Sequence, residues 1–251
     1  MTISADTWQA RAALCELLAL SFRYPDDRTL ADAIASGEWG EAADEIADAL
    51  DVAWDAGTAP GAAEAEAFPD PAELQKALRA EATRLFVGAP NPAVSPYEGV
   101  WRAGDDGVQA LLFVNPHSMA VERFCKACGL GRPEGTNEPL DAVGTELELL
   151  EYLALRAAVD AGEDEGIAGD ESAVEGVVAD DDTLDEFEDA GEPGDVVASA
   201  DLPGGSPEAA WDEFMAEHAA TWMPRFAEKV QEESRIPFYK QAASLLGAFV
   251  D

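Results

Sequence analysis

Two cysteines in a CxxC motif, Cys125 and Cys128, are the residues whose type and spacing point most directly to chemistry. Such a pair can form a redox disulfide or supply half of a structural zinc site. A zinc site needs further ligands, and the chain offers only Cys15, His117 and His218, none of which forms a second pair. A redox pair normally opens a helix, where the dipole stabilises a thiolate, whereas this pair falls at the end of an expected helix. We therefore expect no metal site and no cofactor.

The histidines do not indicate a catalytic centre either. His218 shares an apolar helical face with Phe214 and Trp222, and a histidine on such a face is more often a hydrogen-bonded core residue than a base or a ligand. The chain also lacks the phosphate-loop, dinucleotide-binding, nucleophile-elbow and zincin motifs. We therefore expect a protein that is not an enzyme. Two alternatives stay open: a small thiol-dependent or nucleotide-binding enzyme that uses the CxxC motif, and a generic helical adaptor.

Helices are the elements that must position any site. Apolar residues recur at helical spacing before Pro25, after Asp141 and after Pro237, and each of these stretches predicts an amphipathic helix. Pro224 is expected to bend or end another helix. Strand patterns are too short to compete, although residues 108–114 could form a short extended segment. The prediction is an all-α fold, a single bundle-like domain of about eight helices. Further helix starts are marked by a capping residue followed by proline, at Asp70-Pro71, Asn115-Pro116 and Ser206-Pro207.

A stretch rich in proline and glycine, residues 86–106, departs from the helical pattern and is expected to be a long irregular loop. It nevertheless contains the apolar side chains Tyr97, Val100 and Trp101. An apolar loop must be buried or must bind a partner. Tyr97 and Trp101 are therefore either part of a binding surface or a plug that fills a gap in the core.

A second exception is acidic. Residues 160–206 hold 17 acidic residues and no Lys or Arg. Such a segment cannot bury enough apolar surface to offset an ordering entropy of ~1–2 kcal/mol per residue. We expect a disordered surface insertion here. It would separate the main helical part, residues 1–159, from C-terminal helices, residues 207–251, that complete the same domain.

The net charge of the whole chain limits the classes of partner that it can bind and indicates the salt concentration to which it is adapted. Asp and Glu number 52 against 15 Lys and Arg, which gives a net charge of −37. This excess of acid excludes a basic surface that neutralises the phosphates of nucleic acid or the charge of anionic lipid. At 1 M salt the Debye length falls to about 3 Å and screens such self-repulsion, so we expect a halophilic protein. No apolar run approaches the ~20 residues of a membrane span and no basic leader precedes one, which favours a cytoplasmic protein.

Four motifs stand out in sequence order. They are LFVG at residues 85–88, SPYEGVW at 95–101, NEPLDAVGTELELL at 137–150, and the aromatic and proline pattern of 217–249. Together they resemble the TorD/DmsD/NarJ family of redox-enzyme maturation chaperones, and the second and third motifs are most similar to the DmsD and TorD type. One departure is Ala142, which stands where the family has a histidine after the aspartate.

The resemblance implies both a function and a partner. Members of this family are all-helical and non-enzymatic, and they bind the twin-arginine signal peptide of a molybdopterin oxidoreductase. They hold the apo form of that catalytic subunit until its cofactor is inserted, before export. A DMSO or TMAO reductase-like client is the first expectation, and formation of a homodimer stays open.

The signal peptide combines a basic pair with an apolar segment, so its receptor needs apolar surface with carboxylates nearby. Bidentate pairing of arginine with carboxylate would give the contact its geometric specificity. We expect the stretch around Trp101 and the helix start around Asp141 to lie side by side and to form this cleft. The candidate peptide-binding residues are Leu85, Phe86, Pro96, Tyr97, Glu98, Val100, Trp101, Pro139, Asp141 and Glu146.

Overall fold

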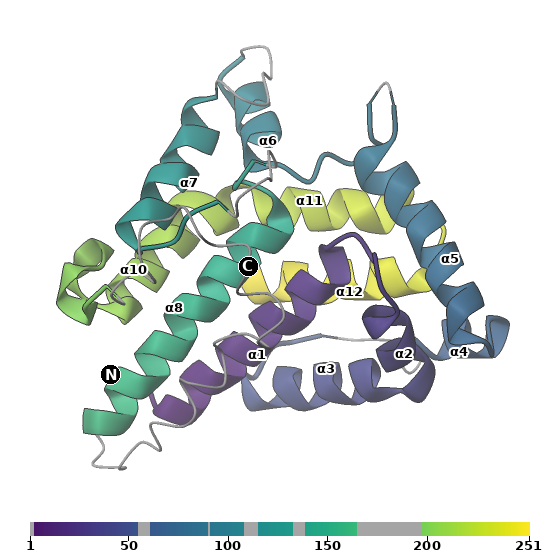
Figure 1. Cartoon of the computed structure of the whole chain (residues 1–251), viewed down its shortest axis with the longest axis horizontal. Helices are drawn as coiled ribbons and strands as arrows, with labels where there is room; N and C mark the ends of the chain where they lie inside the picture. Colours follow the sequence, from purple (N-terminus) through teal and green to yellow (C-terminus); the bar gives the residue numbers. More distant parts are fainter. Residues whose placement is uncertain (1–2, 55–60, 90, 108–114, 133–138, 165–196) are drawn as a thin grey trace.

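The structure, a computed structural model of the 251-residue chain, describes residues 3–54, 61–89, 91–107, 115–132, 139–164 and 197–251. These residues form helices joined by turns, and no strand occurs among them. The predicted all-α class is confirmed, with several short helices in addition to the eight expected (Figure 1). The possible extended segment at residues 108–114 lies outside the described residues.

Two long helices form the centre of the fold, α1 (Ala5–Phe22) and α8 (Val143–Asp164). They lie side by side and run antiparallel, with the start of α1 near the end of α8 (Figure 1). Leu14 and Leu18 from α1 and Leu150 from α8 have no exposed surface. Each such leucine contributes roughly 1.5–3 kcal/mol through burial. The apolar stripes in the sequence therefore predicted each of these two helices correctly, whereas their pairing is seen only in the structure.

The N-terminal helices after α1 cover one end of the pair. They are α2 (Thr29–Ser36), α3 (Glu38–Ala49), α4 (Ala62–Ala67) and α5 (Pro71–Ala82). Trp39 of α3 is fully buried, and its indole N–H donates to Ser21 Oγ at 3.0 Å. The start of α5 is the predicted one, because the Asp70 carboxylate accepts from the backbone N–H of Ala72 at 2.9 Å.

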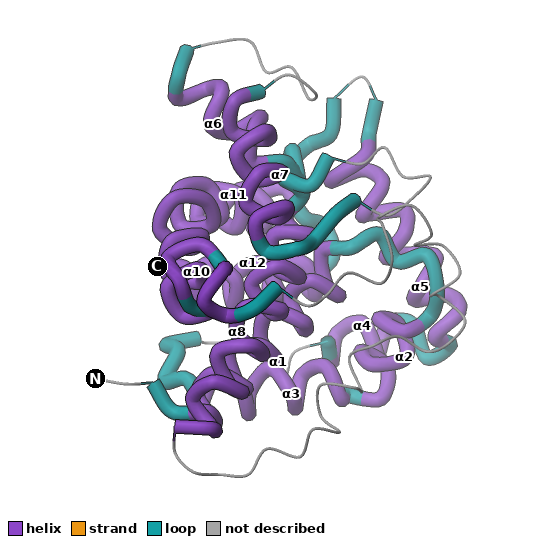
Figure 2. The backbone as a smooth tube through the Cα atoms, turned by 60° about the vertical axis from the view of Figure 1, so that its left-hand side comes forward, coloured by secondary structure: helices purple, strands orange, loops and turns teal. Residues whose placement is uncertain are grey.

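The C-terminal helices pack against the central pair and lie above it in the view of Figure 2. They are α10 (Pro207–Phe214), α11 (Ala220–Glu233) and α12 (Pro237–Val250), and a π-helical turn over Met215–Ala219 joins the first two. The prediction that Pro224 ends the helix is wrong, since α11 continues through Pro224 to Glu233, whereas a bend at Pro224 stays a prediction. A π-helical turn, with its irregular hydrogen bonding, lies directly upstream of α11.

The expected irregular loop over residues 86–106 is partly helical, which corrects the sequence prediction. A π-helical turn covers Thr83–Val87, and α6 covers Glu98–Asp105. A further helix, α7 (Pro116–Ala127), follows with the predicted Asn115 cap. The first amide of α6 is satisfied from a distant part of the chain, because Glu98 N donates to Asp141 O at 2.9 Å. A local pattern cannot reveal a helix start of this kind.

The edges of the expected insertion, residues 160–206, also need correction. Residues 165–196 lie outside the described residues, but residues 160–164 continue α8 and residues 199–205 form two short 3-10 helices. The returning chain is held by Arg156, which donates to Val197 O at 2.8 Å, and by Leu202, which is buried in the core. The buried Leu202 and the hydrogen bonds of Arg156 therefore hold residues 197–202 against the fold.

Candidate functional site

The two stretches expected to form a cleft do lie side by side. An isolated antiparallel bridge joins Tyr97 to Ala142. On either side of this bridge, Val143 N donates to Pro96 O at 2.8 Å and Glu98 N donates to Asp141 O at 2.9 Å. Backbone hydrogen bonds therefore join the proline-rich stretch to the start of α8. We call this contact and the polar side chains beneath it the junction.

Asp141 ties the junction to α7. Its Oδ2 accepts from Gly99 N at 2.9 Å and from Ser118 Oγ at 2.6 Å, while Asn115 Nδ2 donates to Gly99 O at 2.6 Å. A methyl group at position 99 would collide with Ser118 Oγ and would lie 2.9 Å from Asp141 Oδ2, so glycine is needed for this close approach. Burial raises the pKa of Asp141, although its two donors oppose that effect.

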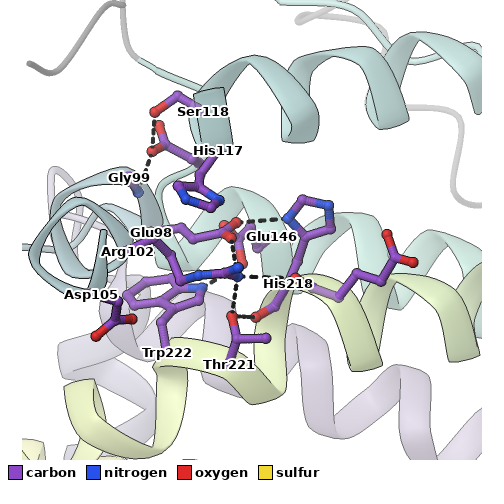
Figure 3. A network of polar contacts seen from close by, with 12 residues as sticks. Glu98, Gly99, Arg102, Asp105, His117, Ser118, Glu146, His218, Thr221 and Trp222 are labelled. Carbon is purple, nitrogen blue, oxygen red and sulfur yellow. Dashed lines mark hydrogen bonds and ion pairs between the residues drawn. The ribbon is translucent and has the colours of Figure 1, made fainter. Parts of the chain in front are cut away.

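Two further carboxyl groups, Glu98 of α6 and Glu146 of α8, are fully buried beneath the bridge and point toward the same spot (Figure 3). Glu98 Oε2 lies 2.8 Å from His218 Nδ1, and Arg102 Nη1 donates to Glu98 Oε1 at 3.2 Å. Trp222 Nε1 donates to Glu146 Oε2 at 3.0 Å. Burial and the neighbouring Glu98 raise the pKa of Glu146 well above its usual value, which favours the protonated form.

His218 and Arg102 of this network both contact other parts of the fold. His218 is 6 % exposed and its ring stacks on Phe214, with centroids 4.8 Å apart. The sequence prediction of a hydrogen-bonded core histidine is therefore confirmed. Arg102 connects α6 to the π turn, because it also donates to Thr221 Oγ1 at 2.7 Å and to Glu217 O at 3.1 Å. No motif in the sequence indicated this link between α6 and α11.

Burial divides the ten candidate peptide-binding residues into two groups. Six of them are buried in this structure, and their role in peptide binding stays a prediction. Both oxygens of Glu98, Asp141 Oδ2 and Glu146 Oε2 make hydrogen bonds within the junction, whereas Asp141 Oδ1 and Glu146 Oε1 have no hydrogen-bond partner among the described residues. Phe86 stacks on Phe226 in the core, with ring centroids 6.0 Å apart. The buried residues are Leu85, Phe86, Glu98, Pro139, Asp141 and Glu146, and the partly exposed ones are Pro96, Tyr97, Val100 and Trp101.

The four partly exposed residues form a ledge above the junction. Trp101 packs its ring against the core, and its Nε1 donates to Ser95 O at 2.9 Å. The guanidinium of Arg225 lies 5.8 Å from the centroid of the Trp101 ring. The same guanidinium bonds both oxygens of Asp105, each at 2.8 Å. Beside the ledge, Arg225 is therefore held by the face of the Trp101 ring and by a bidentate ion pair with Asp105.

The CxxC pair has no environment suited to thiol chemistry. Cys125 and Cys128 lie at the C-terminal end of α7 and are both buried. Burial raises the pKa of Cys125 to about 12 and that of Cys128 to about 11, so the thiols stay protonated near neutral pH. Within the described ranges, no group of three or more His, Cys, Asp and Glu side chains is arranged to hold a metal ion.

The backbone contact of the junction lies within the part of the chain that matches a known family. The sequence model of the nitrate reductase delta subunit family matches residues 34–177. Among curated proteins, no relative matches the chain. Within the part of the chain that the structure describes, no helix is long and apolar enough to cross a membrane.

The family match supports the broader part of the sequence resemblance. It includes the motifs at residues 85–88, 95–101 and 137–150, and it does not single out the DmsD and TorD type. The ledge comes from the second of these motifs, and the Tyr97–Ala142 bridge joins the second to the third. The expectation of a protein that is not an enzyme agrees with the family, which consists of chaperones. Because the match covers more than half of the chain, this protein belongs to the nitrate reductase delta subunit family of redox-enzyme maturation chaperones.

Proposed function

We propose that this protein is a cytoplasmic chaperone that binds the twin-arginine signal peptide of a molybdopterin oxidoreductase of the DMSO or TMAO reductase type. It holds the apo form of the catalytic subunit while the cofactor is inserted, before export. The observation that carries the proposal is the direct backbone contact between the proline-rich stretch and the start of α8, at Tyr97 and Ala142. This contact brings together the second and third of the four motifs that carry the family resemblance.

The ledge provides the apolar half of the proposed site. Pro96, Tyr97, Val100 and Trp101 are all partly exposed. They stand on backbone that the buried hydrogen bonds of Asp141 hold in place. A rigid aromatic surface binds an apolar segment at a small entropic cost, because its own side chains lose little freedom.

The end of α6 provides the carboxylate half. Trp101 and Asp105 are four residues apart on this helix and so share one face. The Asp105 carboxylate is about half exposed (side-chain exposure 48 %) and already pairs with Arg225. An arginine of the signal peptide would bind in the same manner by displacing Arg225 from its place between the aromatic face and the carboxylate. The buried acids Glu98, Asp141 and Glu146 then position the ledge instead of touching the peptide.

A direct binding experiment tests this proposal. Fluorescently labelled signal peptides from a DMSO reductase and a TMAO reductase are titrated with the protein in about 2 M KCl, where the acidic surface is screened. Each peptide is compared with a version in which both arginines are alanine. We expect the arginine pair to strengthen binding about tenfold, as two charge-assisted contacts would. Equal binding of both versions would contradict the proposal.

The same experiment separates the alternatives. Because the matched family is named for the nitrate reductase delta subunit, an N-terminal peptide from a nitrate reductase catalytic subunit forms a third arm. Tighter binding of that peptide would move the client to the nitrate reductase type and leave the chaperone role intact. A generic helical adaptor would bind the mature catalytic subunit and none of the three peptides.

A further inference from the structure

A half-open groove lies on the side of the central helix pair that faces α3, away from the junction. Its volume is about 540 Å³, and its walls come from α1, α3 and α8 together with Thr29 at the start of α2. The floor consists of apolar side chains, among them Leu17 and Leu20 of α1 and Ile46 of α3. All three are only partly buried. The groove is therefore a concave apolar surface that the described chain leaves uncovered.

The rim of the groove is acidic. Glu16 comes from α1, Glu148 and Glu151 come from α8, and Arg23 is the cation among the residues that line the groove. Arg23 Nη1 pairs with Glu148 Oε1 at 3.3 Å. Among the described residues, neither Glu16 nor Glu151 makes a hydrogen bond or an ion pair. Glu16 and Glu151 therefore line the groove without an ion pair among the described residues, although Arg23 is close enough to act on Glu151.

The neighbouring carboxyl groups affect the pKa of Glu151. Its pKa is raised to about 7, first by burial and then by the nearby charges of Glu16 and Glu148, whereas Arg23 lowers it. The facing residues of α3, Ala42 and Ile46, carry no charge. A cation placed between Glu16 and Glu151 would reverse the repulsion and would favour the ionised form of Glu151.

We propose that this groove binds a cationic amphipathic segment of another polypeptide, with an arginine or lysine between Glu16 and Glu151 and its apolar side chains on Leu17, Leu20 and Ile46. This inference goes beyond the proposed function, because the groove and the ledge are separate surfaces. The sign of the rim selects a basic partner. A second copy of this chain would bring a net charge of −37 to an acidic rim, so it is the less favoured occupant.

A designed peptide provides the probe. It is a helical peptide of about 14 residues built from leucine and alanine with two arginines four positions apart, and its control carries glutamine in place of both arginines. Fluorescence anisotropy in about 1 M KCl gives both affinities. We expect the arginine peptide to bind wild-type protein about fivefold more tightly than the glutamine peptide. Equal affinity of the two peptides would overturn the proposal.

Matched variants locate the binding. The double variant Glu16→Gln/Glu151→Gln keeps the shape of the groove and should abolish the preference for arginine. Glu213→Gln removes an exposed charge from α10, outside the groove lining, and should leave the preference unchanged. Thermal unfolding confirms that both variants fold. If the double variant keeps the full arginine preference, the groove is not the site.

A pH series gives a second readout. Binding of a cation should release the proton of Glu151, so affinity for the arginine peptide should rise with pH up to about 7 and then level off. In Glu151→Gln this rise should disappear, whereas an unchanged rise would contradict the assignment. Trp101→Ala alters the ledge and should not change this binding. The groove and the signal-peptide site therefore succeed or fail independently.

Discussion

The junction and the groove each contain three carboxyl groups, yet the two sets differ in almost every physical respect. At the junction, Glu98, Asp141 and Glu146 are at most 1 % exposed. Their hydrogen bonds go to backbone amides and to neutral or cationic side chains of the same chain. In the groove, Glu16 and Glu151 face solvent and have no hydrogen-bond partner among the described residues. Carboxylates therefore serve structure where they are enclosed and remain available for a partner where they are open.

Asp141 gives the sharpest test of the difference between the two sets of carboxyl groups. Asp141→Ala leaves the Gly99 amide and the Ser118 hydroxyl without their acceptor in a buried place. We expect a loss of about 3 to 5 kcal/mol in the free energy of unfolding, measured by urea denaturation at constant salt. Glu16→Ala is the control and should change stability by less than about 0.5 kcal/mol. Similar effects of the two substitutions would show that the buried set is not structural.

Trp101 tests whether the ledge above the junction is a binding surface. Trp101→Ala should weaken binding of the signal peptide by ~1–3 kcal/mol, as the loss of a central aromatic does, while circular dichroism shows a folded protein. Tyr152→Ala removes another half-buried aromatic beside an arginine, on α8, and serves as the control. If Trp101→Ala unfolds the protein, the tryptophan is a core plug instead.

Protonation distinguishes the two carboxylate sets further. The raised pKa of Glu146 means that the folded protein holds a proton that the unfolded chain releases above about pH 4.5. Stability from this group is therefore complete below that pH and is lost as pH rises toward the raised value. Glu146→Gln should remove at least about 1 kcal/mol of this loss between about pH 5 and 8. Glu151→Gln should have a smaller effect of the same sign, because Glu151 is partly solvated. The reverse order would contradict the contrast.

Salt should act on the open set alone. In about 0.2 M KCl, Glu16→Gln/Glu151→Gln should stabilise the fold by about 0.5 to 1 kcal/mol, because it relieves repulsion at the groove rim. In about 2 M KCl the difference should vanish, since the charges are screened. Denaturant titrations at both salt concentrations measure it. A stabilisation that persists at high salt would argue against repulsion as its cause.

The smallest expected effect concerns the thiols. Cys125 and Cys128 should react with a disulfide reagent near pH 8 only as fast as the protein unfolds, because burial raises the pKa of both groups to about 12 and 11. The rate in denaturant gives the reference. Rapid reaction of the folded protein would revive the alternative of a thiol-dependent enzyme.

Local sequence signals determined much of the fold. Capping residues followed by proline marked the starts of α5, α7 and α10, and apolar stripes marked α1, α8 and α12. These signals work because a helix start and a helical face are properties of neighbouring residues. The start of α6 was missed, since its first amides are satisfied by Asp141, more than 40 residues further along the chain. The return of the chain at Leu202 was missed for the same reason.

For the site, the sequence identified the two motifs and the acidic character of the chain, and the family match agrees with those motifs. Only the tertiary structure decided which acids are enclosed and which are open, because glutamates of one helix, Glu146 and Glu151, face opposite environments. Burial and charge pairing depend on residues that meet in space, so identical side chains acquire different protonation and different roles. The composition determined the total charge, and the packing determined which carboxyl groups are buried and which stay on the surface.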